Sequence, residues 1–92
     1  MSKVQHHAQD HQFYIEDHGE IIAEMTYSVS SETLYIIDHT YVDDKYRGQG
    51  LAEDLMSNVA DYARRHQIKL FGLCPFAKRQ LETKSEYADV KY

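Results

Sequence analysis

The spacing of apolar residues changes after Val42, and that change limits the folds open to this chain. From Gln12 to Val42, apolar residues alternate with polar ones, which is the pattern of half-buried β-strands. From Gly50 to His66 they recur at every third or fourth position, as in an amphipathic helix. The short apolar run Ile68–Leu73 then precedes a second helical segment. The pattern therefore predicts strands first, then a helix, a strand and a helix.

Turn residues divide the first part into three strands. Gly19 can adopt a positive φ angle, and the polar Ser30–Glu32 segment interrupts the next alternation. We expect strands over Gln12–Glu16, Ile21–Val29 and Leu34–Val42. The second strand is expected to turn five apolar side chains to one face, namely Ile21, Ala23, Met25, Tyr27 and Val29.

The second part has the length and end residues of a β-α-β crossover. Acidic residues open Gly50–His66 and basic residues close it, which matches the helix dipole. Pro75 suits the first position of a helix over Pro75–Thr83. A right-handed crossover makes Ile68–Leu73 parallel to Leu34–Val42. We therefore predict an α+β (mixed α/β) fold: a three-stranded antiparallel meander, a crossover to a parallel fourth strand and a C-terminal helix, with helices on the faces of a mixed sheet.

Ninety-two residues suit one domain, residues 1–92. Met1–His11 is polar and is expected to be frayed, whereas Ser85–Tyr92 gives no clear signal. No apolar run approaches the length of a membrane span, so we expect no membrane partner. The single cysteine excludes an intrachain disulfide and suits a reducing, cytoplasmic compartment.

Charge is divided unequally along the chain. Residues 1–44 carry nine acids and one basic residue, whereas residues 45–92 carry six acids and nine basic residues, for a net charge of −5. This balance argues against a nucleic-acid partner, which requires lysine and arginine spread over a face. Two interpretations of the acidic half remain open: attraction of a cationic partner, or solubility alone.

Four early histidines raise the question of a metal site: His6, His7, His11 and His18. Without thiolates or a fixed geometry, a mobile polar tail is the favoured interpretation, and we predict no metal.

Two glycines lie in the turn from strand to helix, in the segment Asp43–Ala52. Gly48 and Gly50 allow a tight turn that exposes consecutive backbone N–H groups at the N-terminus of the helix, which suits a phosphate or pyrophosphate. The segment lacks the Lys-Ser/Thr of a P-loop and the third glycine of a dinucleotide fingerprint. An ordinary tight loop is the alternative.

The segment Arg47-x-x-Gly50-x-Ala52 resembles the acetyl-coenzyme A signature of the GNAT superfamily of acyltransferases. With Ile36–Val42 before it and Leu73–Lys78 after it, the chain resembles the very small subfamily with a Cys-Pro-Phe segment, over roughly residues 13–90. The resemblance implies that backbone amides hold the pyrophosphate of coenzyme A, from Arg47, Gly48, Gln49, Gly50, Leu51 and Ala52. It implies that the strand edge at Thr40, Tyr41 and Val42 pairs with the pantetheine arm, and that the thioester enters between the two parallel strands. Candidates for the 3′-phosphate or adenine end are Lys78, Lys45 and Arg79.

The chain also departs from the plan of that superfamily. Typical members begin with a strand and two helices that wall the acceptor site, and nothing before Gln12 is expected to supply them. We therefore expect an open acceptor side, suited to a macromolecular acceptor or to a partner that completes the site. Pro75–Thr83 contains no tyrosine to protonate the departing thiolate, although Tyr87 follows nearby.

Three residues are the catalytic candidates. Cys74 precedes a helix that begins with proline, where a thiolate is favoured and can accept an acetyl group; the alternative is a small buried apolar residue. His39 lies beside the expected thioester channel, and Asp38 has the parity of Leu34 and Ile36, which is expected to face the core. Either can serve as a base or form structural hydrogen bonds only.

The leading hypothesis is an acetyl-coenzyme A-dependent acyltransferase that acetylates an amine, which can belong to a protein, with Cys74 assisted by His39 or Asp38. The alternatives are a non-catalytic module or partner subunit that binds coenzyme A, and an anion-binding domain that ignores coenzyme A. The chain is expected to be a monomer or a weak dimer.

Overall fold

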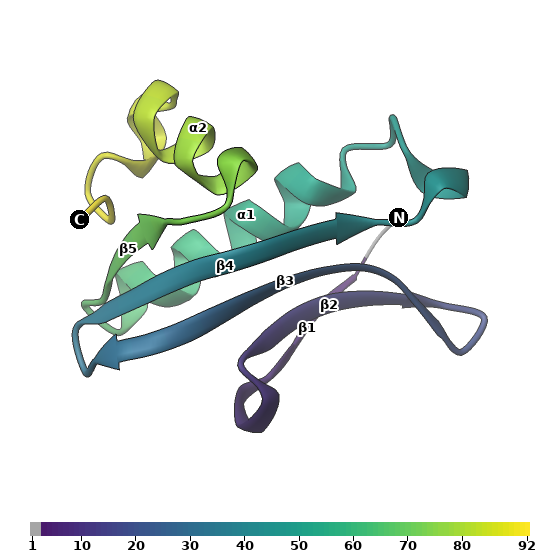
Figure 1. The fold of residues 1–92 in the computed structure, drawn as a ribbon, viewed down its shortest axis with the longest axis horizontal. Helices are drawn as coiled ribbons and strands as arrows, with labels where there is room; N and C mark the ends of the chain where they lie inside the picture. The colour runs from purple at the N-terminus through teal and green to yellow at the C-terminus, as the bar shows by residue number, and fades with distance from the viewer. Residues whose placement is uncertain (1–2) are drawn as a thin grey trace.

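The computed structural model describes residues 3–92, which form one five-stranded sheet with two α-helices (Figure 1). The sheet order follows the chain order. β1 to β4 are antiparallel neighbours, and β5 lies parallel to β4. The elements are β1 (Val4–His7), β2 (Gln12–Asp17), β3 (Glu20–Ser31), β4 (Leu34–Val42), α1 (Leu51–Arg65), β5 (Lys69–Gly72) and α2 (Pro75–Thr83), with 3-10 turns at Ala8–Asp10, Asp44–Tyr46 and Ser85–Tyr87. The predicted fold class and the parallel crossover are confirmed.

The antiparallel part has one strand more than predicted. The segment expected to be frayed forms β1, which pairs Val4 with Ile15 and His6 with Phe13. The imidazole of His6 stacks on the Phe13 ring at a centroid distance of 4.0 Å. A histidine thus occupies a position where an apolar residue would have signalled a strand. Residues 1–2 of that segment lie outside the described residues.

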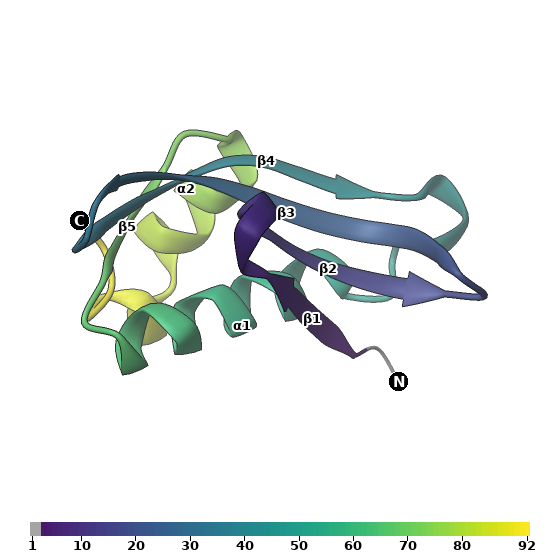
Figure 2. The ribbon, with the colours of Figure 1, turned by 90° about the horizontal axis from the view of Figure 1, so that it is seen from below.

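Both helices lie on one side of the sheet, which corrects the expectation of helices on both faces (Figure 2). The Tyr35 ring packs 6.4 Å from the Tyr62 ring of α1, so that face of β4 is turned to α1. Gly72 pairs with Ile37 on the same face, and the backbone of α2 lies where a Gly72 side chain would be. Among residues 3–92, no helix covers the opposite face of the sheet.

Two bulges change which side chains reach the core. In β3, Ile15 pairs with Ala23 and Glu16 with Ile21, so Ile22 is the extra residue. Ile22 is consequently buried, while Ile21 is 40% exposed. Val29 also lies outside the core, at 45% exposure near the end of the strand. The prediction that five apolar residues share one face of β3 was therefore wrong for Ile21, whereas Val29 pairs with Tyr35 and keeps that face despite its exposure.

The second bulge lies in β4. Thr26 pairs with His39 and Tyr27 with Ile37, which leaves Asp38 unpaired. The buried residue of this strand is Ile37, so its neighbours Ile36 and Asp38 lie on the uncovered face. The expectation that Asp38 faces the core is corrected.

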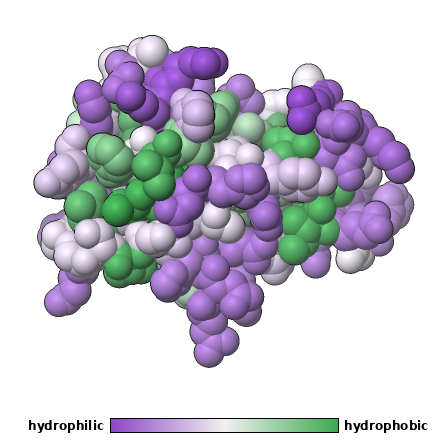
Figure 3. Space-filling model, in the orientation of Figure 1, coloured by the Kyte–Doolittle hydropathy of each residue, from purple (hydrophilic) through white to green (hydrophobic). Residues whose placement is uncertain are grey.

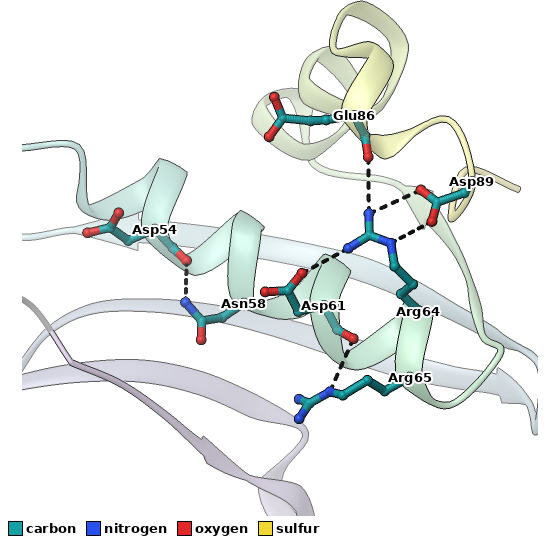
Figure 4. Close-up of polar contacts among 7 residues, drawn as sticks. All are labelled: Asp54, Asn58, Asp61, Arg64, Arg65, Glu86 and Asp89. Atoms are coloured by element: carbon teal, nitrogen blue, oxygen red, sulfur yellow. Dashed lines mark hydrogen bonds and ion pairs between the residues drawn. The ribbon is translucent and has the colours of Figure 1, made fainter.

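The C-terminal tail, which gave no clear signal, closes the core beneath β5. Tyr87 and Val90 are buried, and the Tyr92 backbone N–H donates to the Leu70 carbonyl at 2.9 Å. The Arg64 guanidinium of α1 holds this tail through both carboxylate oxygens of Asp89 and through the Glu86 carbonyl (Figure 4). These bonds lower the pKa of Asp89, although the group is solvent-exposed.

His6 makes stability depend on pH. Its Nε2 lies 2.7 Å from the Tyr27 hydroxyl. Burial, and next the neighbouring His66, His11 and His7, lower the pKa of His6 below its ordinary value of 6.5. The folded state therefore disfavours protonation, and stability falls as pH drops below about 6.5 toward the lowered pKa. We expect the decline in urea-unfolding free energy between pH 7 and pH 5 to be shallower in His6→Phe.

The control for that experiment is His18→Asn, at a turn residue whose side chain is 89% exposed and whose φ angle is 51°. Asparagine tolerates that conformation, so this variant should keep the wild-type pH dependence. An unchanged slope in His6→Phe would contradict a role for the His6 imidazole.

Gly72 should tolerate no side chain. A Cβ at this position would lie 2.5 Å from the Lys78 nitrogen and 2.8 Å from the Ala77 carbonyl carbon. Gly72→Ala is therefore expected to destabilise the fold by about 2–3 kcal/mol, as overpacking does in a close-packed interior. Urea unfolding measures the loss, with Phe71→Ala on the exposed side of the same strand as the milder control. Equal stability of Gly72→Ala and wild type would show that α2 can move away without cost.

Candidate functional site

The loop between β4 and α1 presents a row of free backbone amides. Gly48 and Gly50 have φ angles of 82° and 78°, in the left-handed region that favours glycine. Gly50 is the N-cap of α1 and provides no side-chain cap. Within residues 3–92 the amides from Gly48 to Glu53 have no acceptor; the next amide, of Asp54, donates to the Gly50 carbonyl. This row, at the positive end of a 15-residue helix, suits an anion.

β4 and β5 separate at Ile37. The Ile37 carbonyl accepts the amides of both Leu73 and Cys74, at 3.0 and 3.2 Å, and there β5 ends. β4 continues to Val42 without a strand partner on that edge among the described residues. We call the opening between Ile37 and Cys74 the splay.

A pocket of about 290 Å³ lies between the free edge of β4, the glycine loop and the start of α2. Its lining contains six of the residues predicted to bind the cofactor: Thr40, Val42, Arg47, Gly48, Leu51 and Ala52. Two further lining residues, Tyr46 and Phe76, were not predicted. Phe76 belongs to the Cys-Pro-Phe segment, and Tyr46 directly precedes Arg47. Their places in or beside these motifs could have identified both as pocket residues.

The other predicted binding residues lie outside this pocket. Tyr41 is 42% exposed on the uncovered face, opposite Glu24. Lys78 is exposed and lines a separate groove between β5 and α2. Gln49 lines a cavity of about 910 Å³ between β1, β2 and α1, and Gly50 caps the helix. The 910 Å³ cavity shares Tyr46 and Leu51 with the smaller pocket but does not reach Cys74.

Cys74 lies at the splay beside Thr40. Its Sγ is 3.3 Å from the Thr40 Oγ1 and accepts the Ala77 amide at 3.4 Å as the N-cap of α2. The residue is 9% exposed. Thr40 also lines the pocket, so its hydroxyl connects the cysteine sulfur to the pocket.

The other two catalytic candidates are on the opposite side of the sheet. His39 alternates with Thr40 and is exposed on the uncovered face. Asp38 accepts a 2.6 Å hydrogen bond from the Ser28 hydroxyl. Among residues 3–92 no hydrogen bond joins either residue to Cys74. The structure therefore pairs Cys74 with Thr40, which the sequence analysis did not foresee.

Charged groups surround the glycine loop. Arg47 forms an exposed ion pair with Asp44 at 2.9 Å, an interaction that contributes little by itself. The Tyr46 hydroxyl donates to Asp17 at 2.6 Å. This hydrogen bond is the main cause that raises the pKa of Tyr46, so the tyrosine remains a neutral donor near pH 7.

Other candidate sites find no support in the described part of the chain. Tyr87 is buried against α1 rather than lining the pocket, and burial raises its pKa. Within residues 3–92, no three histidine, cysteine or acidic side chains gather into a metal site. None of the helices described there is long and apolar enough to cross a membrane.

Residues 12–90 match the family described as GCN5-related N-acetyl-transferase. The chain is also similar to a GCN5-like protein from Staphylococcus aureus known from its solution structure, at 34% identity with a TM-score of 0.80. That match covers 98% of this chain and 87% of the other. No curated relative matches significantly.

Larger enzymes share the fold at lower identity. A GNAT family acetyltransferase from Elizabethkingia anophelis with acetyl-CoA bound has a TM-score of 0.62 at 20% identity, covering 83% of this chain and 51% of that enzyme. A ribosomal-protein-alanine N-acetyltransferase from Brucella melitensis biovar Abortus has a TM-score of 0.60 at 22% identity, covering 88% of this chain and 60% of that enzyme. This chain therefore spans only about half the length of these two enzymes.

Proposed function

The chain belongs to the GCN5-related N-acetyltransferase family, and from that premise we propose that it binds acetyl-coenzyme A and transfers the acetyl group to an amine. The observation that carries the proposal is the pocket that joins the free amides of the glycine loop to the splay beside Cys74. Such a pocket matches a long ligand with an anionic middle and a reactive thioester end. The unpaired cysteine supports a reducing, cytoplasmic compartment.

The ligand lies along the pocket from loop to splay. The amides from Gly48 to Ala52 bind the pyrophosphate, because they lack partners at a helix N-terminus, whereas the Arg47 amide already donates to the Asp44 carbonyl. The pantetheine arm follows the free edge of β4 at Thr40 and Val42, with Phe76 as the opposite wall. This arrangement delivers the thioester to Thr40 and Cys74.

Transfer then proceeds in two steps. The Cys74 thiolate attacks the thioester carbonyl, a new carbon–sulfur bond forms, and coenzyme A leaves as a thiolate that takes up a proton. The acceptor amine, as free base, next attacks acetyl-Cys74, forms the amide and releases the Cys74 thiolate. His39 or Asp38, on the uncovered face, removes the proton from the amine before the amine reaches acetyl-Cys74.

A second candidate function is supported by Tyr87 and by the burial of Cys74. The tyrosine that could protonate a departing thiolate lies in the core, and Cys74 as a residue is only 9% exposed. A binding module that holds coenzyme A without turnover would need neither group. Release of free coenzyme A with an amine present distinguishes the enzyme from the module.

The glycine loop can be tested by a pair of substitutions with matched strain. Gly48 and Gly19 have φ angles of 82° and 79°, and a Cβ at either site meets no atom within 4 Å. Valine imposes similar backbone strain at both positions. We expect Gly48→Val to weaken acetyl-coenzyme A binding at least ~10-fold by calorimetry, because the amide row is displaced, while Gly19→Val keeps the wild-type affinity. Equal affinities of the two variants would remove the loop from the binding site.

The covalent route predicts a mass change. Mixed with acetyl-coenzyme A and no amine, the protein should gain one acetyl group by intact-mass spectrometry, and Cys74→Ser should not. Thr40→Val, which removes the hydroxyl 3.3 Å from the sulfur, should slow the gain without abolishing it. Amine acetylation that persists in Cys74→Ser would replace the covalent route with direct transfer.

A further inference from the structure

Apolar side chains gather at the outer edge of β5, on the side away from β4. Three large apolar residues stay exposed here: Phe71 at 45%, Leu73 at 62% and Tyr92 at 71%. The Phe71 and Tyr92 rings meet edge to face at a centroid distance of 6.4 Å. Figure 3 shows an apolar area over β5 and the adjoining part of the sheet, bordered by hydrophilic surface. We call these three side chains, together with the groove beside them, the β5 patch.

The groove of the β5 patch has a volume of about 210 Å³ and lies between β5 and α2. Its apolar lining includes the buried side chains of Leu70 and Leu81. Three charged residues also line it, namely Lys78, Glu82 and Lys91. Within residues 3–92 none of these three forms an ion pair. The groove therefore combines apolar surface with charges of both signs that have no partner within the described chain.

The order of these charges indicates what kind of partner fits. Lys78 and Glu82 are exposed one turn apart on α2, and both line the groove. A wholly acidic partner would meet Glu82, and a wholly basic one would meet Lys78 and Lys91. A second copy of this chain, turned about a two-fold axis, presents the same two charges of α2 in reverse order. Lys69 of β5 leaves this balance unchanged, because its Nζ already donates to the Asp89 carbonyl at 2.6 Å.

We propose that the β5 patch joins two copies of this chain in a symmetric dimer, in which the two α2 helices are antiparallel. Lys78 of each copy then pairs with Glu82 of the other, twice across the axis. The exposed Phe71, Leu73 and Tyr92 of the two copies cover one another, which removes apolar surface from water. The contact involves fewer residues than the roughly 20–30 per side of a standard interface, so a weak dimer is expected, with a Kd of about 10–100 μM.

The β5 patch is separate from the pocket proposed for coenzyme A. The groove and that pocket have no lining residue in common. Phe76, in the first turn of α2, lines the pocket, whereas Lys78 and Glu82 line the groove. A dimer through the patch leaves both pockets open, so the inference does not depend on the proposed function.

Sedimentation velocity at protein concentrations from about 5 to 500 μM measures the association. The sedimentation coefficient of the wild type should rise across this range from that of a monomer to that of a dimer. Leu73→Glu places a charge in the patch and should keep the protein monomeric throughout. The control is Ile21→Glu, at a residue that is 40% exposed and pairs with Glu16 at the start of β3. This variant should associate as the wild type does.

Charge reversal tests the proposed pairing directly. Lys78→Glu sets two glutamates opposite each other across the axis, and Glu82→Lys does the same with two lysines. Each should weaken association by ~10-fold or more, since like charges then face each other at the interface. Lys78→Glu combined with Glu82→Lys restores opposite charges and should bring the Kd back to within ~3-fold of the wild type. Arg79→Glu, outside the groove, should weaken association by no more than ~2-fold through long-range charge.

Three results would overturn the inference: a monomer at every concentration, a dimer that persists in a folded Leu73→Glu, or a double charge variant no tighter than the single ones. The amide spectrum of each variant is recorded first. Lys78 and Glu82 are exposed, so their variants should fold even where Leu73→Glu does not. In that case the two single reversals and their combination decide the matter alone.

Discussion

The separation of β5 from β4 at Ile37 is the constraint on which the site depends. One carbonyl accepts two successive amides, of Leu73 and Cys74, so the ladder ends while β4 continues. Gly72, the last residue of β5, has no side chain, so the backbone of α2 packs directly against the sheet at the point where the two strands separate. The free edge of β4, the position of Cys74 and the wall formed by Phe76 all follow from this close approach.

Elements with a clear local signal could be predicted from the sequence. The bounds of β4 and α2 agree with the expected ranges, because alternation defines the former and Pro75 begins the latter. The strand β1 was missed since His6 takes an apolar position by stacking on Phe13. The bulges at Ile22 and Asp38 were missed because an extra residue leaves the composition of a strand unchanged while it reverses the faces. The side occupied by α2 depends on a tertiary contact at Gly72 and has no local signal.

The parts of the site that have a local signal could also be predicted from the sequence. Glycines with positive φ angles mark the loop, and alternation from Thr40 through Val42 brings two side chains to one pocket while Tyr41 points away. His39 was expected beside the thioester channel because it is adjacent to Thr40 in the chain. In the structure it lies on the other face of the sheet. Tyr46 and Phe76 complete the pocket through contacts between distant segments, including the hydrogen bond from Tyr46 to Asp17. Such contacts depend on the folded arrangement rather than on a motif.

The division of charge along the chain becomes a division in space. The acidic residues 4–44 form the antiparallel strands and their turns, whereas nine of the ten basic residues follow, in the glycine loop, α1, β5, α2 and the C-terminal tail. If solubility alone were the purpose, charges of both signs spread over every face would serve better and would carry less self-repulsion. Segregation instead gives the antiparallel strands a net negative charge and the segments that follow them a net positive one.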